Sequence, residues 1–132
     1  MRSTHRLGLA LAGLAVAATA ALAQAPGIKR SILQRADVAM AGPHECVMGT
    51  AELAAGGSVG KHLHHGVEMG LVLEGETELL VDGEAPRQLK AGDSYQVPAL
   101  RPHDARNTGA GPLRLAATWV VEKGKPLAEP VK

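Results

Sequence analysis

Near its middle the chain reads Gly56-Gly57-Ser58-Val59-Gly60-Lys61-His62-Leu63-His64-His65-Gly66-Val67-Glu68. Side chains at i and i+2 project from the same face of a β-strand, so His62 and His64 would lie side by side. Glu68 follows past Gly66, which allows the chain to turn. Two imidazoles and one carboxylate form a ligand set suited to a first-row transition metal with open coordination positions.

A second stretch further along reads Gly92-Asp93-Ser94-Tyr95-Gln96-Val97-Pro98-Ala99-Leu100-Arg101-Pro102-His103-Asp104-Ala105-Arg106-Asn107. Its His103 could complete a site of three histidines and one carboxylate. Such a set accepts Fe, Mn, Co, Ni, Cu or Zn, and affinity alone favours copper and zinc. The residue types therefore indicate a metal site without naming the metal.

Together the two stretches resemble the paired motifs of the cupin superfamily. The first motif combines two glycines, a His-x-His pair and a glutamate. The chain fills these positions with Gly56, His62, His64, Glu68 and Gly75. Single short motifs match by chance, but two long ones in the right order and separation rarely do.

The second motif is filled by Gly92, Pro98, His103 and Asn107, while Leu100 replaces its inner glycine. We expect Arg101-Pro102 to form the local turn instead, since proline presets a turn angle. The resemblance covers roughly residues 45 to 121.

The resemblance implies an all-β fold, the cupin double-stranded β-helix or jelly-roll β-barrel. It also implies one divalent transition metal ion, of Fe, Mn, Ni, Cu or Zn. The implied ligands are His62, His64, Glu68 and His103.

The strand pattern agrees with such a fold. Short alternating segments are separated by Gly, Pro and the hairpin signal Asp82-Gly83. We expect strands at residues 44–53, 61–65, 67–73, 77–81, 94–97, 103–107 and 113–121, and no helix in residues 24–132. Residues 44–123 would form the cupin barrel domain, 24–43 an N-terminal arm and 124–132 a C-terminal tail.

Residues 1–23 have the features of a secretory signal peptide. Arg2 and Arg6 precede an uncharged, alanine-rich apolar run, and Ala21-Leu22-Ala23 is a small-x-small cleavage site. We expect cleavage after Ala23 and a periplasmic or secreted protein. An uncleaved membrane anchor is the alternative, although the run is shorter than the ~20 residues that a span needs.

The charge balance excludes some partners. Without residues 1–23 the chain has 12 basic and 13 acidic residues. This balance offers no electrostatic footprint for nucleic acid or an anionic membrane. We expect a small-molecule ligand or substrate, no nucleic acid and no membrane after signal removal. A homodimer is also expected, with the strand-like arm at residues 28–38 exchanged between subunits.

Four further residues have two readings each. Cys46 is a buried structural thiol or, alternatively, forms an intermolecular disulfide. His65 should point away from His64, as a loop histidine or as a partner of the metal ligands. Met48 and Trp119 are expected in the core rather than at a ligand.

These features leave two functions open. The first is a metal-dependent enzyme, a dioxygenase or a lyase, on a small oxygenated metabolite, with Glu68 as the catalytic residue. The second is a non-catalytic periplasmic module that binds a metal or a small ligand. Fold alone does not decide between them.

Overall fold

The computed structural model describes residues 33, 34, 36, 38 and 40–132. The expected signal peptide, its cleavage site and most of the expected arm strand lie outside these residues. No described residue belongs to a helix that could cross a membrane. The fold below is that of the compact unit from residue 32 onward.

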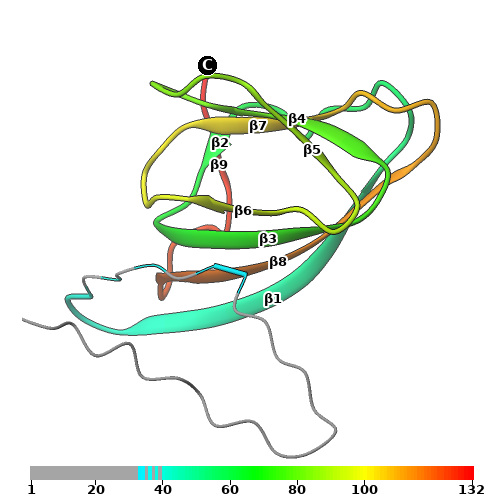
Figure 1. The fold of residues 1–132 in the computed structure, drawn as a ribbon. Coiled ribbons are helices and arrows are strands. Elements are labelled where there is room, and N and C mark those ends of the chain that lie inside the picture. Colours follow the sequence, from blue (N-terminus) through cyan, green and yellow to red (C-terminus); the bar gives the residue numbers. More distant parts are fainter. Residues whose placement is uncertain (1–32, 35, 37, 39) are drawn as a thin grey trace, which may run out of the picture. The chain divides into compact units, whose positions relative to one another are not determined.

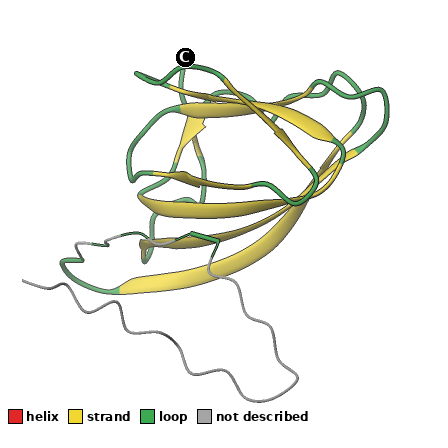
Figure 2. Cartoon of the chain, in the orientation of Figure 1, coloured by secondary structure: helices red, strands yellow, loops and turns green. Residues whose placement is uncertain are grey.

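All regular structure in the described residues is β-strand (Figure 2). The strands are β1 (His44–Leu53), β2 (His62–Leu63), β3 (Gly66–Glu74), β4 (Glu76–Val81), β5 (Arg87–Lys90), β6 (Ser94–Val97), β7 (His103–Asn107), β8 (Leu113–Glu122) and β9 (Glu129–Pro130).

The strands form two antiparallel sheets that face each other (Figure 1). One sheet has the order β1-β8-β3-β6 and the other the order β5-β4-β7-β2-β9. Neighbours in each sheet are often far apart in sequence, as in β1 with β8 and β4 with β7. This is the expected all-β jelly-roll fold.

The core between the sheets is built from small and aliphatic side chains. Its buried members are Val72, Leu79, Val81, Tyr95, Val97, Ala105, Leu113 and Leu115. They come from alternate positions of β3, β4, β6, β7 and β8, because every second side chain of a strand faces the same way. One region between the sheets is instead occupied by buried polar residues, among them His64, Glu68 and His103.

The motif glycines sit at turns that need a left-handed backbone. Gly56, Gly75 and Gly92 have φ values of 74°, 83° and 93°, where a side chain is strained. Leu100, which replaces the fourth motif glycine, keeps the same geometry with φ 60°. The Arg101 N–H closes the turn on the Pro98 carbonyl at 3.3 Å. The expectation that Arg101-Pro102 would form this turn is therefore wrong, since the turn spans residues 98–101.

The C-terminal segment takes part in the fold. The sequence predicted no strand in residues 124–132, but β9 pairs with β2, with Leu63 opposite Glu129. The Val131 N–H also donates to the Lys61 carbonyl at 2.9 Å. This segment therefore borders the strand that carries His62.

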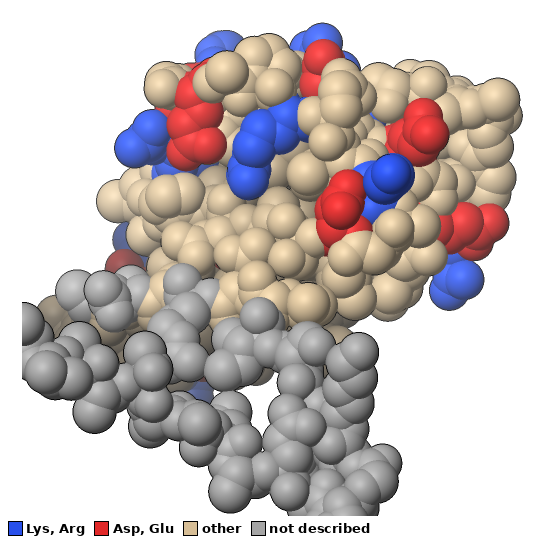
Figure 3. All heavy atoms as spheres, in the orientation of Figure 1, with Lys and Arg blue, Asp and Glu red and all other residues tan. Residues whose placement is uncertain are grey.

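The charged surface is mixed in sign. On the face drawn in Figure 3, acidic and basic side chains alternate without a continuous patch of one sign. Ion pairs such as Lys61 with Asp82, at 2.8 Å, account for part of this pattern.

Candidate metal centre

Three strands and one loop bring the four motif residues together. His62 on β2 lies directly opposite His103 on β7, and Glu68 lies on β3. His64 lies between β2 and β3. His64, Glu68 and His103 are buried, with 4%, 5% and 3% of their surfaces exposed, and His62 is partly buried.

The four side chains form one compact cluster. One ligand atom from each of His62, His64, Glu68 and His103 lies within 4.8 Å of the others. The three imidazole rings have centroids 4.3 to 5.0 Å apart. The sequence-predicted residues are thus brought together as one group.

Backbone carbonyls fix the orientation of all three rings. The Nδ1 atom of His62 is 2.6 Å from the Gly60 carbonyl, and that of His103 is 2.9 Å from the Arg101 carbonyl. His64 makes the same contact with the Leu127 carbonyl. A carbonyl can only accept, so each Nδ1–H donates to its carbonyl, and Nε2 is the ring nitrogen left to act as a ligand.

Glu68 is the centre of the hydrogen-bond network. Its Oε1 accepts from the Tyr95 hydroxyl at 2.8 Å, and its Oε2 lies 2.8 Å from His64 Nε2 and 3.2 Å from His103 Nε2. Burial alone would raise the pKa of Glu68, but the contacts with His103, His64 and Tyr95 outweigh it and lower the pKa. Glu68 is therefore a carboxylate at neutral pH.

The pKa values of His62 and His103 shift in opposite directions. Burial lowers the pKa of His62, and the Gly60 carbonyl only partly offsets this effect. Burial acts the same way on His103, but Glu68 and the Arg101 carbonyl raise its pKa overall. The two directions differ because Glu68 hydrogen-bonds to His103 but acts on His62 only weakly through its charge.

This donor set fits a metal ion. His64 Nε2 and Glu68 Oε2 lie 2.8 Å apart, close enough for both atoms to bind one cation. Ligands at about 2.1 Å from a metal lie roughly 3 Å apart in cis and about 4.2 Å apart in trans. The cluster is close to these separations.

Both aromatic residues of the chain line the cavity at this cluster. The chain has one Tyr, one Trp and no Phe, and Tyr95 and Trp119 border a cavity of about 70 Å³ together with His62, Glu68 and His103. The Trp119 Nε1–H donates to His64 Nε2 at 3.2 Å. Trp119, which was expected in the core, therefore lies at the cavity beside the cluster.

Tyr95 reaches Glu68 because β3 has a glycine beside it. Gly70 lies opposite Tyr95 in the register of β3 and β6. A Cβ at residue 70 would stand 2.1 Å from the Tyr95 ring, far inside van der Waals contact. Tyr95 faces the cavity, whereas its neighbour Gln96 lines a separate pocket on the other face of the sheet.

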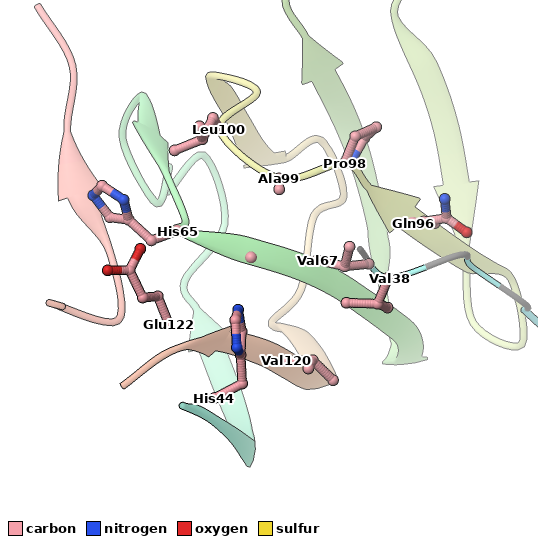
Figure 4. A pocket seen from close by; sticks show the side chains of 11 residues that line it. Val38, His44, His65, Val67, Gln96, Pro98, Ala99, Leu100, Val120 and Glu122 are labelled. Atoms are coloured by element: carbon pink, nitrogen blue, oxygen red, sulfur yellow. The ribbon is translucent and has the colours of Figure 1, made fainter. Parts of the chain in front are cut away.

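His65 faces away from the cluster. It lines a separate pocket of about 410 Å³ on the other side of the segment, together with His44 and Glu122 (Figure 4). Its Nε2 lies 2.8 Å from Glu129 Oε2 on β9. His65 therefore contacts the C-terminal segment rather than the ligand atoms.

Two core expectations for β1 are wrong. Met48 is 77% exposed, and Cys46 is also exposed, so the buried-thiol reading fails. Val47 and Gly49 have the more buried positions, with Gly49 against the Trp119 ring. β1 turns its Cys46 face outward.

Asn107 has a structural role at the end of β7. Its side-chain amide donates to the carbonyls of Leu53, Ala54 and Gly111 at 2.9 to 3.0 Å. It ties the end of β7 to two loops and does not contact the cluster.

Solved structures with a similar fold include enzymes. DMSP lyase DddQ from Ruegeria pomeroyi DSS-3 is 26% identical with a TM-score of 0.60, over 65% of this chain and 43% of the lyase. A predicted oxalate decarboxylase from Thermotoga maritima is 30% identical with a TM-score of 0.53, over 58% of this chain and 66% of that one.

An uncharacterized conserved protein with a double-stranded β-helix domain, from Klebsiella pneumoniae subsp. pneumoniae MGH 78578, is 27% identical with a TM-score of 0.56. That match covers 64% of this chain and 75% of the other. This chain spans 43% of the length of the DMSP lyase, so only part of that enzyme is represented here. No curated protein matches this sequence.

The family assignment draws on the sequence as well as the fold. The family model described as "Cupin domain" matches residues 49–121, which include both motif stretches and all four clustered side chains. With two antiparallel sheets and a buried cluster of three histidines and one glutamate, the chain belongs to the cupin family.

Proposed function

We propose that the protein is a metal-dependent enzyme, a lyase or a dioxygenase, that acts on a small oxygen-containing metabolite. The observation that carries this proposal is the convergence of three histidines and one ionised carboxylate in a largely buried cluster beside a cavity. Polar groups are costly to bury without a partner, and a metal ion would supply one.

His62, His64, Glu68 and His103 are the proposed ligands of one divalent transition metal ion. Such an ion would act as a Lewis acid towards an oxygen atom of the substrate. The metal could be Fe, Mn, Ni, Cu or Zn, since imidazole and carboxylate accept all of them.

Glu68 is the proposed catalytic residue. Its Oε2 lies between two histidine Nε2 atoms, while its Oε1 receives the Tyr95 hydroxyl at 2.8 Å. Burial, followed by the charge of Glu68, raises the pKa of Tyr95. Tyr95 thus stays protonated and holds the carboxylate in place, and Glu68 can hold a proton of the substrate.

The cavity limits the size of the substrate. Its volume of about 70 Å³ is about half of the ~150 Å³ cavity that accommodates benzene in another protein. Ala105, Ala117 and Leu115 form its apolar wall. A molecule of a few heavy atoms, or one end of a longer molecule, would fit beside the ligand atoms.

The similar structures support this class of activity. The DMSP lyase and the predicted oxalate decarboxylase both act, by their names, on small molecules. The two matches are 26% and 30% identical, and each covers less than two thirds of either protein. They therefore support a reaction class and no particular substrate.

The enzyme is further proposed to work outside the cytoplasm. The support is the sequence of residues 1–23, with its basic start, apolar run and Ala-x-Ala site. Intact mass of the mature protein should place the N-terminus at Gln24. Full-length protein that pellets with membranes would contradict export by cleavage.

The test of the activity compares the wild type with Glu68→Gln. The protein is loaded in turn with Fe, Mn, Ni, Cu and Zn, metal content is measured, and small hydroxy, keto and dicarboxylic acids are offered. Substrate loss and oxygen consumption are the readouts. At equal metal occupancy, Glu68→Gln should lower turnover by about 10²–10⁴-fold, as expected for a positioned proton-transfer group.

A second candidate, a non-catalytic module for a metal or small ligand, has one observation in its favour. Glu68 is already engaged by His64, His103 and Tyr95, which leaves no carboxylate oxygen without a partner. If a small acid binds every metal form and none consumes it, the enzyme proposal fails and this one stands.

A further inference from the structure

Asp104 is a buried carboxylate that does not face the metal centre. It follows His103 on β7, and strand alternation turns its side chain to the opposite face of the sheet. Only 6% of its surface is exposed. A loop of the chain contacts it on this face.

The covering loop is the segment from Gly57 to Gly60, which precedes His62. It runs along β7 as an irregular extra strand. The Asn107 N–H donates to the Gly57 carbonyl at 2.8 Å, and the Val59 N–H donates to the Ala105 carbonyl at 3.0 Å. Backbone contacts therefore join the loop to β7 at Gly57 and Val59, and β2 pairs with β7 again at His62.

The Asp104 carboxylate also holds the loop, through hydrogen bonds with Ser58 and Gly60. Its oxygens accept the Ser58 hydroxyl at 2.8 and 2.9 Å, and its Oδ1 accepts the Gly60 N–H at 2.9 Å. The Ser58 Oγ also accepts the Gly60 N–H at 3.0 Å. Arg106 Nε donates to Asp104 Oδ2 at 3.1 Å.

Gly60 is held from both sides. Its N–H points to Asp104, and its carbonyl accepts the Nδ1–H of His62 at 2.6 Å. The residue has φ 88°, a conformation that links these two directions and favours glycine. The contact at the Gly60 N–H therefore restrains the residue whose carbonyl orients the His62 ring.

We propose that Asp104 is a positioning residue for the metal ligand His62, acting through Ser58 and the backbone of Gly60. The inference rests on the proposed metal site and deepens it. His64 and His103 are deeply buried, whereas His62 is only partly buried. Packing holds His62 least, so its orientation depends most on this chain of hydrogen bonds.

The primary test measures Zn²⁺ affinity by competition with a chelator for the wild type, Asp104→Ala, Asp104→Asn and Arg106→Gln. Partners that orient a ligand commonly change metal affinity by about 10–100-fold. Asp104→Ala should weaken Zn²⁺ binding by about 10-fold, at the low end because Asp104 acts through one more link. Asp104→Asn keeps an oxygen for Gly60 and should lose less.

Arg106→Gln is the matched control, because it removes the charged partner of Asp104 but leaves the contacts with Ser58 and Gly60. It should bind Zn²⁺ like the wild type. An Arg106→Gln variant as weak as Asp104→Ala would overturn the proposal, since the effect would then be one of charge rather than of loop position.

A double-mutant cycle with His62→Ala separates positioning from general damage. With His62 absent, Asp104→Ala should have no further effect on Zn²⁺ affinity. The absorption spectrum of the Co²⁺ form should also change in Asp104→Ala towards that of His62→Ala. The same fold-loss in both backgrounds, or an unchanged spectrum, would refute the role of Asp104.

Thermal melting of each variant checks the fold. If Asp104→Ala does not fold, Ser58→Ala, which removes one link of the same chain, takes its place in the cycle. A wild-type protein that binds no Zn²⁺ or Co²⁺ would contradict the proposed metal site itself. Wild-type binding with an unaffected Asp104→Ala would contradict only the present inference.

Discussion

Leu113 and Glu68 are buried to a similar degree between the two sheets, with 0% and 5% of their surfaces exposed, but they are held in different ways. Leu113 belongs to an apolar cluster with Val72 and Leu79, where any well-packed aliphatic neighbour would serve. Glu68 needs Tyr95 and two histidines at hydrogen-bond distance. The apolar cluster is stabilised by the apolar surface that it removes from water. The polar region is stable only when each buried polar group has a partner.

The two regions should therefore respond differently to substitution. Substitutions in the apolar cluster should change stability without changing metal affinity, and substitutions in the histidine cluster should change both. The four predictions below run from the largest expected effect to the smallest.

Leu113→Ala should lower the free energy of unfolding by about 2–5 kcal/mol, because it removes buried methyl groups and leaves a cavity. Urea denaturation of the metal-free protein measures this change. Leu73→Ala is the control, since Leu73 is 42% exposed and surface changes stay within about 0.5 kcal/mol. A clear loss of metal affinity in folded Leu113→Ala would contradict the expectation that the apolar cluster affects stability alone.

Metal removal should destabilise the wild type and spare His64→Ala. A ligand at a hundredfold excess over its Kd adds about 2.7 kcal/mol to the native state. Dialysis against a chelator should therefore lower the wild-type melting temperature and leave that of His64→Ala unchanged. Equal melting curves for treated and untreated wild type, with no bound metal, would contradict the site.

Tyr95→Phe should lower the stability of the metal-free protein at pH 7 by about 1.5 kcal/mol, the lower value for a hydrogen bond to a charged group. The folded pKa of Glu68 lies below its unfolded value of about 4.3. The stability from ionised Glu68 is thus present above pH ~4.3 and lost as the pH falls towards the folded pKa.

Both proteins have the same unfolded pKa for Glu68, so their difference in stability should stay full while Glu68 is ionised in both folded proteins, and should shrink only near the lowered folded pKa. Urea denaturation at pH 7 and at about pH 4, close to the unfolded pKa, should therefore give the same difference. A difference that grows in acid would show that Tyr95 stabilises the protonated form of Glu68 instead.

Leu100→Gly should stabilise the protein by about 0.5 kcal/mol. The left-handed conformation of Leu100 costs about 1–2 kcal/mol, and the greater freedom of glycine in the unfolded chain offsets roughly 0.5–1 kcal/mol of that. Leu100→Ala keeps the Cβ and should gain nothing. Equal stability changes in the two variants would argue that strain at Leu100 is negligible.

The ligand set and the fold class were predictable because both depend on residue types at fixed spacing. His62, His64, Glu68 and His103 follow from the two motifs, and β6 and β7 coincide with the predicted ranges. The turn at Leu100 was not predictable from propensity, since leucine rarely adopts a positive φ. Tertiary contacts such as the Leu100 N–H to the His64 carbonyl, at 2.9 Å, hold it there.

Two other features have no signature in the sequence. The Leu127 carbonyl that orients His64 is a backbone atom, which any residue could supply. In β1, Met48 and Val47 are both apolar, so alternation alone could not say which of the two faces inward. The outcome depends on Trp119, which packs against the same inner face at Gly49.

The missing side chain of Gly70 also has a consequence for the evolution of this site. Because a Cβ there would collide with the Tyr95 ring, residue 70 cannot gain a side chain while residue 95 stays tyrosine. Among relatives with this strand register, a side chain at position 70 should occur with a residue smaller than tyrosine at position 95. The two positions should therefore vary together, and a lineage that exchanged both would lose the hydroxyl that holds Glu68.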